Sequence, residues 1–142
     1  MASSETYELS RGLESRRSKA RKTSGTESRP RTLAATESGA IVGFATFSPA
    51  EDGDRKSIAE LNALYVEPDY WKRGIGAALE TAARASLIEL GYQRAMLWVL
   101  AGNVRAIGFY ESQGWRPNGI ARQAEVWGIT VEEISYVRSL PR

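Results

Sequence analysis

The sequence predicts an α+β domain built around a mixed β-sheet, and two observations carry this prediction. From residue 31 onward, short apolar runs alternate with Gly, Asn and Pro turn signals, which is typical of strands. Two further segments repeat their apolar residues at spacings of three and four, which is typical of helices. The predicted order is three strands, a helix, a strand, a helix and two strands, as in an α+β or mixed-sheet domain.

The first three predicted strands occupy residues 31–68. Residues 31–49 (RTLAATESGAIVGFATFSP) hold two apolar runs around a Glu-Ser-Gly turn, which predicts a β-hairpin. After a polar loop, residues 57–68 (SIAELNALYVEP) form a third strand that Pro68 ends. Its apolar residues do not alternate cleanly: Ile58, Leu61, Leu64 and Val66. This break in the period of two predicts a β-bulge or a strand buried on both faces.

A helix and a fourth strand follow. Residues 75–90 place apolar side chains at spacings of three and four, and Gly91 is suited to end this helix. The compact apolar run QRAMLWVL (residues 93–100) then predicts a buried strand.

The C-terminal part of the chain predicts a short helix and two strands. Asn103 is suited to cap a helix over residues 104–113, which Gly114 ends. Residues 119–140 hold two apolar segments on either side of Gly128, which predicts a final pair of strands.

The composition excludes several kinds of active site. The chain of 142 residues has no cysteine, which excludes disulfides, zinc sites built on thiolates and a cysteine nucleophile. It also has no histidine, which excludes a Ser-His-Asp triad, an imidazole base and the commonest transition-metal ligand. Acid–base chemistry must therefore use carboxylates, Tyr, Lys or water, and no metal site is predicted.

Residues 1–30 form a basic, Ser/Arg-rich leader ahead of the domain predicted for residues 31–142. The basic excess is concentrated in residues 15–22 (SRRSKARK). Such a segment is typical of an arm that binds nucleic acid, or of a weak helix or mobile leader. Because no aromatic side chains interleave with the charges, the second interpretation is favoured, and nucleic acid is not an expected partner.

The overall composition is that of a globular domain, with 42% hydrophobic and 25% charged residues. No apolar run is long enough to span a membrane, and the first residues, MASSETYELS, lack the apolar core of a signal peptide. The sequence therefore predicts a cytoplasmic protein without a membrane partner.

The stretch DYWKRGIGAAL (residues 69–79) lies between the third strand and the first helix. The first N–H groups of a helix lack internal partners and attract anions, and glycine lets an anion approach the main chain. The sequence after Gly74 does not fit a P-loop, and Leu79 stands where a dinucleotide fingerprint needs Gly or Ala. Taken alone, the stretch is equally typical of an anion site and of a flexible turn.

A second motif favours the anion site. The segment NVRAIGFYESQGW (residues 103–115) has the form N-x-x-A-x-x-F-Y-E-x-x-G-W. Together with LYVEPDYWKRGIGAAL (residues 64–79), it resembles the GNAT superfamily of N-acetyltransferases over residues 31–140. The resemblance implies a mixed, mostly antiparallel central sheet with a splayed strand pair and flanking helices. The family usually begins with a strand and two helices, so the N-terminal part is expected to be reduced.

The resemblance implies that acetyl-CoA binds between the splayed strands and that its pyrophosphate lies on the glycine loop. Main-chain amides would hold the pyrophosphate, the strand before the loop would carry a bulge around residues 64–66, and the Val66 amide or a neighbour would polarise the thioester. Tyr110 would be the general acid, and Glu60 would be the general base. The implied cofactor-binding residues are Leu64, Tyr65, Val66, Lys72, Arg73, Gly74, Ile75, Gly76, Ala77, Ala78, Asn103 and Tyr110.

The same residues also have structural interpretations. Tyr110 is compatible with plain core packing, Glu60 with a surface charge on an edge strand, and Asn103 with capping alone. Trp71 stands where the family usually has Gln or Arg. Binding is therefore expected from the main chain, with Lys72 or Arg73 in place of that side chain.

The expected function is transfer of an acetyl group from acetyl-CoA to a primary amine by direct attack in a ternary complex. Such transfer requires neither a nucleophilic side chain nor a metal, so a chain without His and Cys can catalyse it. Small molecules and protein amines are both open as acceptors, and so is pairing of the C-terminal strands in a homodimer. A non-catalytic acyl-CoA-binding sensor is the alternative, and a nucleic-acid adaptor that uses residues 15–22 is a third hypothesis.

Overall fold

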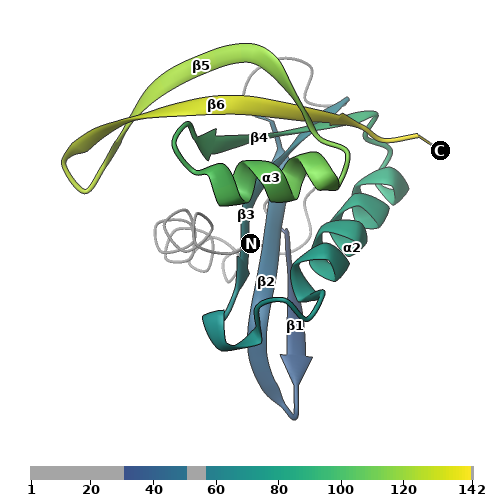
Figure 1. Ribbon diagram of the computed structural model, residues 1–142. Coiled ribbons are helices and arrows are strands. Elements are labelled where there is room, and N and C mark those ends of the chain that lie inside the picture. The colour runs from purple at the N-terminus through teal and green to yellow at the C-terminus, as the bar shows by residue number, and fades with distance from the viewer. Residues whose placement is uncertain (1–30, 51–56, 142) are drawn as a thin grey trace.

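The computed structural model describes residues 31–50 and 57–141 (Figure 1). The predicted leader, its basic segment and most of the polar loop after the hairpin lie outside the described residues. The strands are β1 (Arg31–Glu37), β2 (Ala40–Pro49), β3 (Ile58–Val66), β4 (Arg94–Leu100), β5 (Arg116–Val126) and β6 (Ile129–Ser139). The helices are α2 (Ile75–Glu89), α3 (Val104–Ser112) and the 3-10 turn η1 (Pro68–Tyr70).

The strands form one mixed sheet in the order β1-β2-β3-β4-β6-β5. Neighbouring strands are antiparallel except for β3 and β4, which are parallel and are connected through α2. The predicted α+β class and the predicted element order are therefore confirmed. The predicted hairpin is β1–β2, and its turn uses left-handed backbone at Ser38 (φ 51°) and Gly39 (φ 83°), as a tight hairpin turn requires.

The β-bulge in β3 lies at Asn62. In the ladder with β2, Thr46 pairs with Ala63 and Phe47 pairs with Leu61, so Asn62 is the extra residue. The bulge explains why the apolar residues of β3 do not alternate, because Leu61 and Leu64 both enter the same core cluster although they are three positions apart. The bulge was expected around residues 64–66, and this position is corrected by two residues.

The parallel strands β3 and β4 pair over only three residues. The register joins residues 58–60 of β3 to residues 94–96 of β4, and the two strands diverge beyond that point. Figure 1 shows the result: β4, β5 and β6 run across the direction of β1, β2 and β3. The predicted splayed pair is confirmed, and its opening lies at the carboxyl ends of both strands.

The two faces of the sheet differ in character. On one face, α2 and α3 enclose the main core cluster, to which Leu61, Leu97, Leu79 and Tyr110 belong. Side chains alternate along a strand, so the residues between the core positions point to the opposite face. That face carries Ile58, Glu60, Met96, Trp98, Ser135 and Val137, and none of the described helices covers it.

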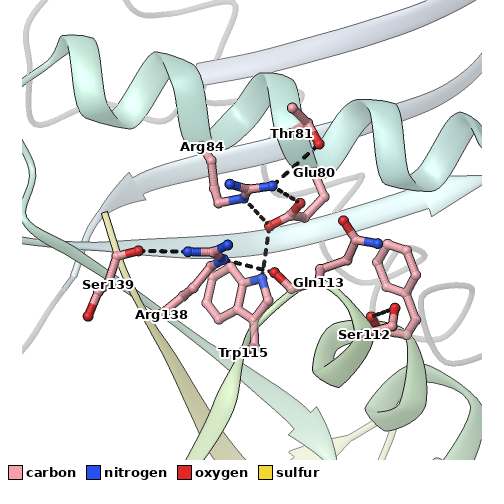
Figure 2. Close-up of polar contacts among 9 residues, drawn as sticks. Glu80, Thr81, Arg84, Ser112, Gln113, Trp115, Arg138 and Ser139 are labelled. Atoms are coloured by element: carbon pink, nitrogen blue, oxygen red, sulfur yellow. Dashed lines mark hydrogen bonds and ion pairs between the residues drawn. The ribbon is translucent and has the colours of Figure 1, made fainter. Parts of the chain in front are cut away.

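A buried carboxylate connects α2 to the segment just before β5 (Figure 2). Glu80 of α2 is fully buried, and its Oε2 accepts a 2.9 Å hydrogen bond from Nε1 of Trp115, which is 1% exposed. Arg84, one turn further along α2, donates to both carboxylate oxygens at 2.7 and 3.1 Å. Because an unpaired buried charge is costly, these donors are what make Glu80 tolerable in the core.

The α3 helix is fastened to β6 at its C-terminal end. The Tyr136 hydroxyl donates to Glu111 Oε2 at 2.8 Å, and Arg138 Nε donates to the Gln113 carbonyl at 2.8 Å. Burial, and then the hydrogen bond to Glu111, raise the pKa of Tyr136 above its usual value, so this tyrosine stays a neutral donor near neutral pH. These bonds fix the position of α3 relative to β6.

The Glu80–Trp115 bond predicts a stability difference between two Trp-to-Phe variants. Trp115→Phe removes the indole donor and leaves the buried carboxylate under-satisfied, so we expect the free energy of unfolding to fall by about 2–3 kcal/mol. Trp127→Phe is the matched control, because Trp127 is 70% exposed. Chemical denaturation of both variants gives the comparison. Equal loss in the two variants would contradict a stabilising role for the Glu80–Trp115 bond.

Candidate functional site

Beyond their three paired residues β3 and β4 separate, and the entrance to the opening between them is here called the mouth. The N-terminus of α2 lies at this mouth. Gly74 is its N-cap residue in left-handed backbone (φ 82°), and no side chain caps the helix. The first-turn N–H groups of residues 75–77 have no acceptor within the helix. Ala78 is different, because its N–H donates to the Gly74 carbonyl at 3.0 Å. Among the amides predicted to bind the anion, the Ala78 N–H is therefore the one already used in the helix ladder.

Two basic side chains precede this helix. Lys72 is exposed and also has left-handed backbone (φ 67°). Arg73 lies 4.9 Å from the centre of the Tyr70 ring and 3.8 Å from the Glu37 carboxylate, with both charged side chains about half exposed. An exposed pair of this kind is weak, so Arg73 can still reach an anion at the helix terminus.

Trp71 connects the two sides of the mouth. Its Nε1 donates to the Val66 carbonyl at 2.7 Å, which fixes the indole against the end of β3. The guanidinium of Arg105, in the first turn of α3, lies 4.3 Å from the centre of the Trp71 ring. The position where the family usually has a polar side chain thus holds an aromatic ring that keeps a cation at the mouth. No local pattern of residues indicates this contact, because 34 positions separate the two residues.

The end of β3 presents main-chain groups to the mouth. The Glu67 N–H donates to the Val42 carbonyl. In an antiparallel pair, hydrogen-bonded and non-hydrogen-bonded residues alternate along each strand, so this bond shows which residues of β3 bond to β2. By that alternation, the main-chain groups of Tyr65 pair with β2, while those of Leu64 and Val66 point away from β2. Leu64 and Val66 lie beyond the last β3–β4 pair, so their N–H groups face the opening. The Tyr65 main-chain groups are hydrogen-bonded to β2 and therefore do not face the opening.

The α3 helix brings Asn103 and Tyr110 to the other side of the mouth. Asn103 Oδ1 accepts from the Ala106 N–H at 3.1 Å, so the predicted cap is confirmed. Tyr110 is 6% exposed, and its ring packs edge-on against Phe109 and Trp115 at centroid distances of 5.2 and 6.0 Å. It belongs to the same core cluster as residues of β3 and β4. This packing fits the structural interpretation of Tyr110 and also fixes its ring beside the splayed strands.

Glu60 stands at the apex of the opening, on the opposite face from α3. It is the last residue of β3 that pairs with β4, where it lies opposite Met96. Since β3 has neighbours on both sides, Glu60 is not on an edge strand. It lines a pocket of about 470 Å³ on the face of the sheet that the described helices leave uncovered.

The pocket also contains residues that the sequence analysis did not single out as a site. Trp98 of β4, Arg122 of β5 and Ser135 of β6 line it together with Glu60. Trp98 lines this pocket with the Arg122 guanidinium 4.0 Å from its ring centre. No local pattern joins these residues, because they come from four strands.

Comparison with known proteins identifies the family. The sequence model of the acetyltransferase (GNAT) family matches residues 3–115. The chain belongs to this family. The match begins inside the segment that the sequence analysis assigned to a leader, and it ends where β5 begins. The predicted family resemblance is confirmed.

Curated relatives are named N-acetyltransferases. The chain is 29% identical over 103 residues to the uncharacterized N-acetyltransferase YuaI of Bacillus subtilis, which is 72% of this chain. It is 36% identical over 94 residues, or 66% of this chain, to an uncharacterized N-acetyltransferase of Mycobacterium bovis. The matched segment spans 58% of the length of each of these relatives.

Solved structures of GNAT acetyltransferases share the fold. The ribosomal-protein-S18-alanine N-acetyltransferase of Escherichia coli superposes with a TM-score of 0.69 at 23% identity, over 93% of this chain and 77% of that chain. A GNAT acetyltransferase of Elizabethkingia anophelis with acetyl-CoA bound gives a TM-score of 0.67 at 16% identity, over 78% and 76%. Within residues 31–50 and 57–141, neither α-helix has the length and apolar character needed to cross a membrane.

Proposed function

We propose that this GNAT-family chain transfers an acetyl group from acetyl-CoA to a primary amine. The observation that carries the proposal is the pairing of β3 and β4 over only three residues. It leaves an opening between the two strands with different functional groups at its two ends. An uncapped helix terminus lies at the mouth, and a carboxylate lies at the apex. The relatives named N-acetyltransferases and the neighbour with acetyl-CoA bound support the same activity.

The residues at the mouth fit the diphosphate of acetyl-CoA. The N–H groups of residues 75–77 supply donors at the positive end of the α2 dipole, and Gly74 keeps the approach free of a side chain. Lys72, Arg73 and Arg105 add positive charge around this terminus. Arg105, held on the Trp71 ring, takes the place of the polar side chain that position 71 usually supplies. The pantetheine arm would lie between β3 and β4, beside Asn103.

The catalytic steps are assigned to three groups of this chain. Bound acetyl-CoA would supply a thioester whose carbonyl carbon an amine can attack. Glu60 takes a proton from the amine, directly or through water, so that the nitrogen has a free electron pair. The Val66 N–H, or the Leu64 N–H beside it, donates to the oxygen that becomes negative. As the C–N bond forms and the C–S bond breaks, the Tyr110 hydroxyl gives a proton to the departing sulfur and is later reprotonated from water.

Acetyl transfer itself is tested by incubating the full chain with acetyl-CoA and a broad panel of amines, followed by mass spectrometry. An acetylated amine, with one free CoA per acetyl group, supports the proposal. If acetyl-CoA binds but no amine is acetylated, the chain is an acyl-CoA-binding sensor instead. A cytoplasmic location and a homodimer stay predictions.

Cofactor binding predicts a thermal shift. Acetyl-CoA at a hundredfold excess over its Kd should stabilise the folded chain by about 2.7 kcal/mol, which corresponds to a rise in Tm of about 5–10 °C. In Gly74→Val the shift should be lost, because left-handed backbone at this position strains any β-branched residue and the new side chain blocks the amides. Gly108→Val, on the exposed side of α3 with open space around it, is the matched control. No shift at millimolar acetyl-CoA would contradict cofactor binding.

The assignment of Tyr110 predicts a loss of turnover without a loss of affinity. Tyr110→Phe keeps the ring packed against Trp115 but removes the proton donor, so kcat should fall by roughly 10²-fold. The KM for acetyl-CoA should stay within about twofold. Tyr92→Phe is the control, because Tyr92 is a buried tyrosine that precedes β4 at the end away from the opening. An unchanged kcat in Tyr110→Phe would leave this residue with a packing role only.

The assignment of Glu60 predicts a deficit that depends on pH. Glu60→Gln removes the base, so kcat/KM for the amine should fall by roughly 10²-fold near neutral pH. The deficit should shrink as the pH approaches the pKa of the amine, because more of the amine is then unprotonated before it binds. A deficit that is constant across this pH range would mean that Glu60 acts in binding or in structure and not as the base.

A further inference from the structure

The pocket beside Glu60 has a second polar end. Its volume of about 470 Å³ suits a small molecule or a few residues of a peptide. Glu60 lies on the β3 side, and Ser135 of β6 lies further along on the side toward β5. Between them the floor is apolar, with Met96 and Val137 directly opposite each other on β4 and β6. The pocket can therefore take a molecule that is polar at two points and apolar between them.

Ser135 is a buried hydroxyl that lines this pocket and has no hydrogen-bond partner among the described residues. It is 2% exposed, and its Oγ is enclosed without a donor or acceptor in the parts of the chain that the structure describes. Leaving a buried polar group unpaired is unfavourable, and such groups are rare in native proteins. A ligand oxygen that accepts from the Ser135 hydroxyl would remove this cost.

Arg122 is held in place beside Ser135. Its Nε donates to Glu133 Oε1 at 2.8 Å, and its guanidinium lies 4.0 Å from the centre of the Trp98 ring. Trp98 is the direct register partner of Ser135. A guanidinium fixed in this way loses little freedom when a ligand binds, and its other N–H groups are donors for an oxygen. This end of the pocket has no acidic excess, because Arg122 balances Glu133.

The strand register sets the spacing between the two polar ends. Glu60 lies on β3 and Ser135 lies on β6, with β4 between them, and the two residues are offset by two positions along the strands. Their Cα atoms are therefore roughly 12 Å from each other. Once the reach of both side chains is subtracted, the ligand's amine and oxygen must be only a few bonds apart. An α-amine next to a carbonyl or carboxylate meets this requirement, whereas a long polyamine does not.

We propose that this pocket is the acceptor site, and that it selects the α-amine of an apolar amino acid or of a peptide N-terminus. The amine lies at Glu60, the adjacent carbonyl or carboxylate oxygen accepts from Ser135 and Arg122, and the apolar side chain packs on Met96 and Val137. This inference rests on the proposed acetyl transfer and names its substrate class. The charge balance of the pocket disfavours polycationic amines.

The experiment compares test amines that differ in one feature. Phenylalaninamide and phenethylamine share a phenyl group joined through two carbons to a primary aliphatic amine, and only the former has a carbonyl. Phenylalanine replaces the amide by a carboxylate and so distinguishes a free amino acid from a peptide-like end, while spermidine represents the polyamines. Acetyl transfer by the full chain is followed by CoA release, and kcat/KM is measured for each amine. The same amines are then tested with Ser135→Ala and with Ser139→Ala, an exposed serine on the same strand.

We expect kcat/KM for phenylalaninamide or phenylalanine to exceed that for phenethylamine and spermidine by at least tenfold. In Ser135→Ala this advantage should fall about tenfold while the KM for acetyl-CoA stays unchanged, and in Ser139→Ala it should be kept. Equal rates with phenylalaninamide and phenethylamine, or a preference for spermidine, would overturn this substrate class and leave acetyl transfer intact. No transfer to any of the four also overturns it, and the broad amine panel then tests acetyl transfer separately.

Discussion

The short parallel contact between β3 and β4 is the constraint on which the rest of the structure depends. Three register pairs hold the two strands together, and beyond Glu60 and Met96 the strands separate. Main-chain groups that leave a ladder must find other partners or face a ligand or water. At Val66 the carbonyl takes the Trp71 indole as its partner, while the N–H faces the opening. The splay thus creates both the space for a cofactor arm and a main-chain donor inside it.

Two half-sheets that share so few ladder bonds need another connection. The α2 helix packs against β1, β2 and β3, and through the buried Glu80 it binds Trp115, the residue before β5. The carboxylate is stable there because Arg84 and Trp115 both donate to it. This connection crosses the helix side of the sheet, away from the pocket. The opening can therefore be held rigid without filling the space that substrates need.

The proposed proton donor and the proposed base lie on opposite sides of the opening. Tyr110 belongs to the apolar core on the helix side, whereas Glu60 lies on the opposite face in a pocket with polar ends. A proton donor and a base placed on opposite sides of one reacting carbonyl do not neutralise each other. The cofactor and the acceptor can also enter from different directions, which a ternary complex requires.

The sequence by itself determined the features that depend on residues close together in the chain. The Ser38–Gly39 turn, the Asn103 cap and the break in alternation at β3 follow from residues a few positions apart, and the structure confirms each of them. Local spacing also showed that Gly74 opens a helix after a strand, but not that Ala78 already belongs to the helix ladder. Whether the Ala78 N–H is used within the helix depends on the residue at which the first turn begins, and a shift of one residue changes the outcome.

What only the tertiary structure decided are the contacts that strand order creates. Glu60, Trp98, Arg122 and Ser135 share a pocket because β3, β4, β6 and β5 are neighbours in that order, although the chain runs through β5 before β6. Likewise Arg105 meets Trp71 because parallel β3 and β4 bring their following segments to the same edge. Turns and caps arise from local hydrogen bonds and backbone preferences, so a sequence displays them. Pairing between distant strands depends on burying a common core, and no local pattern of residues specifies it.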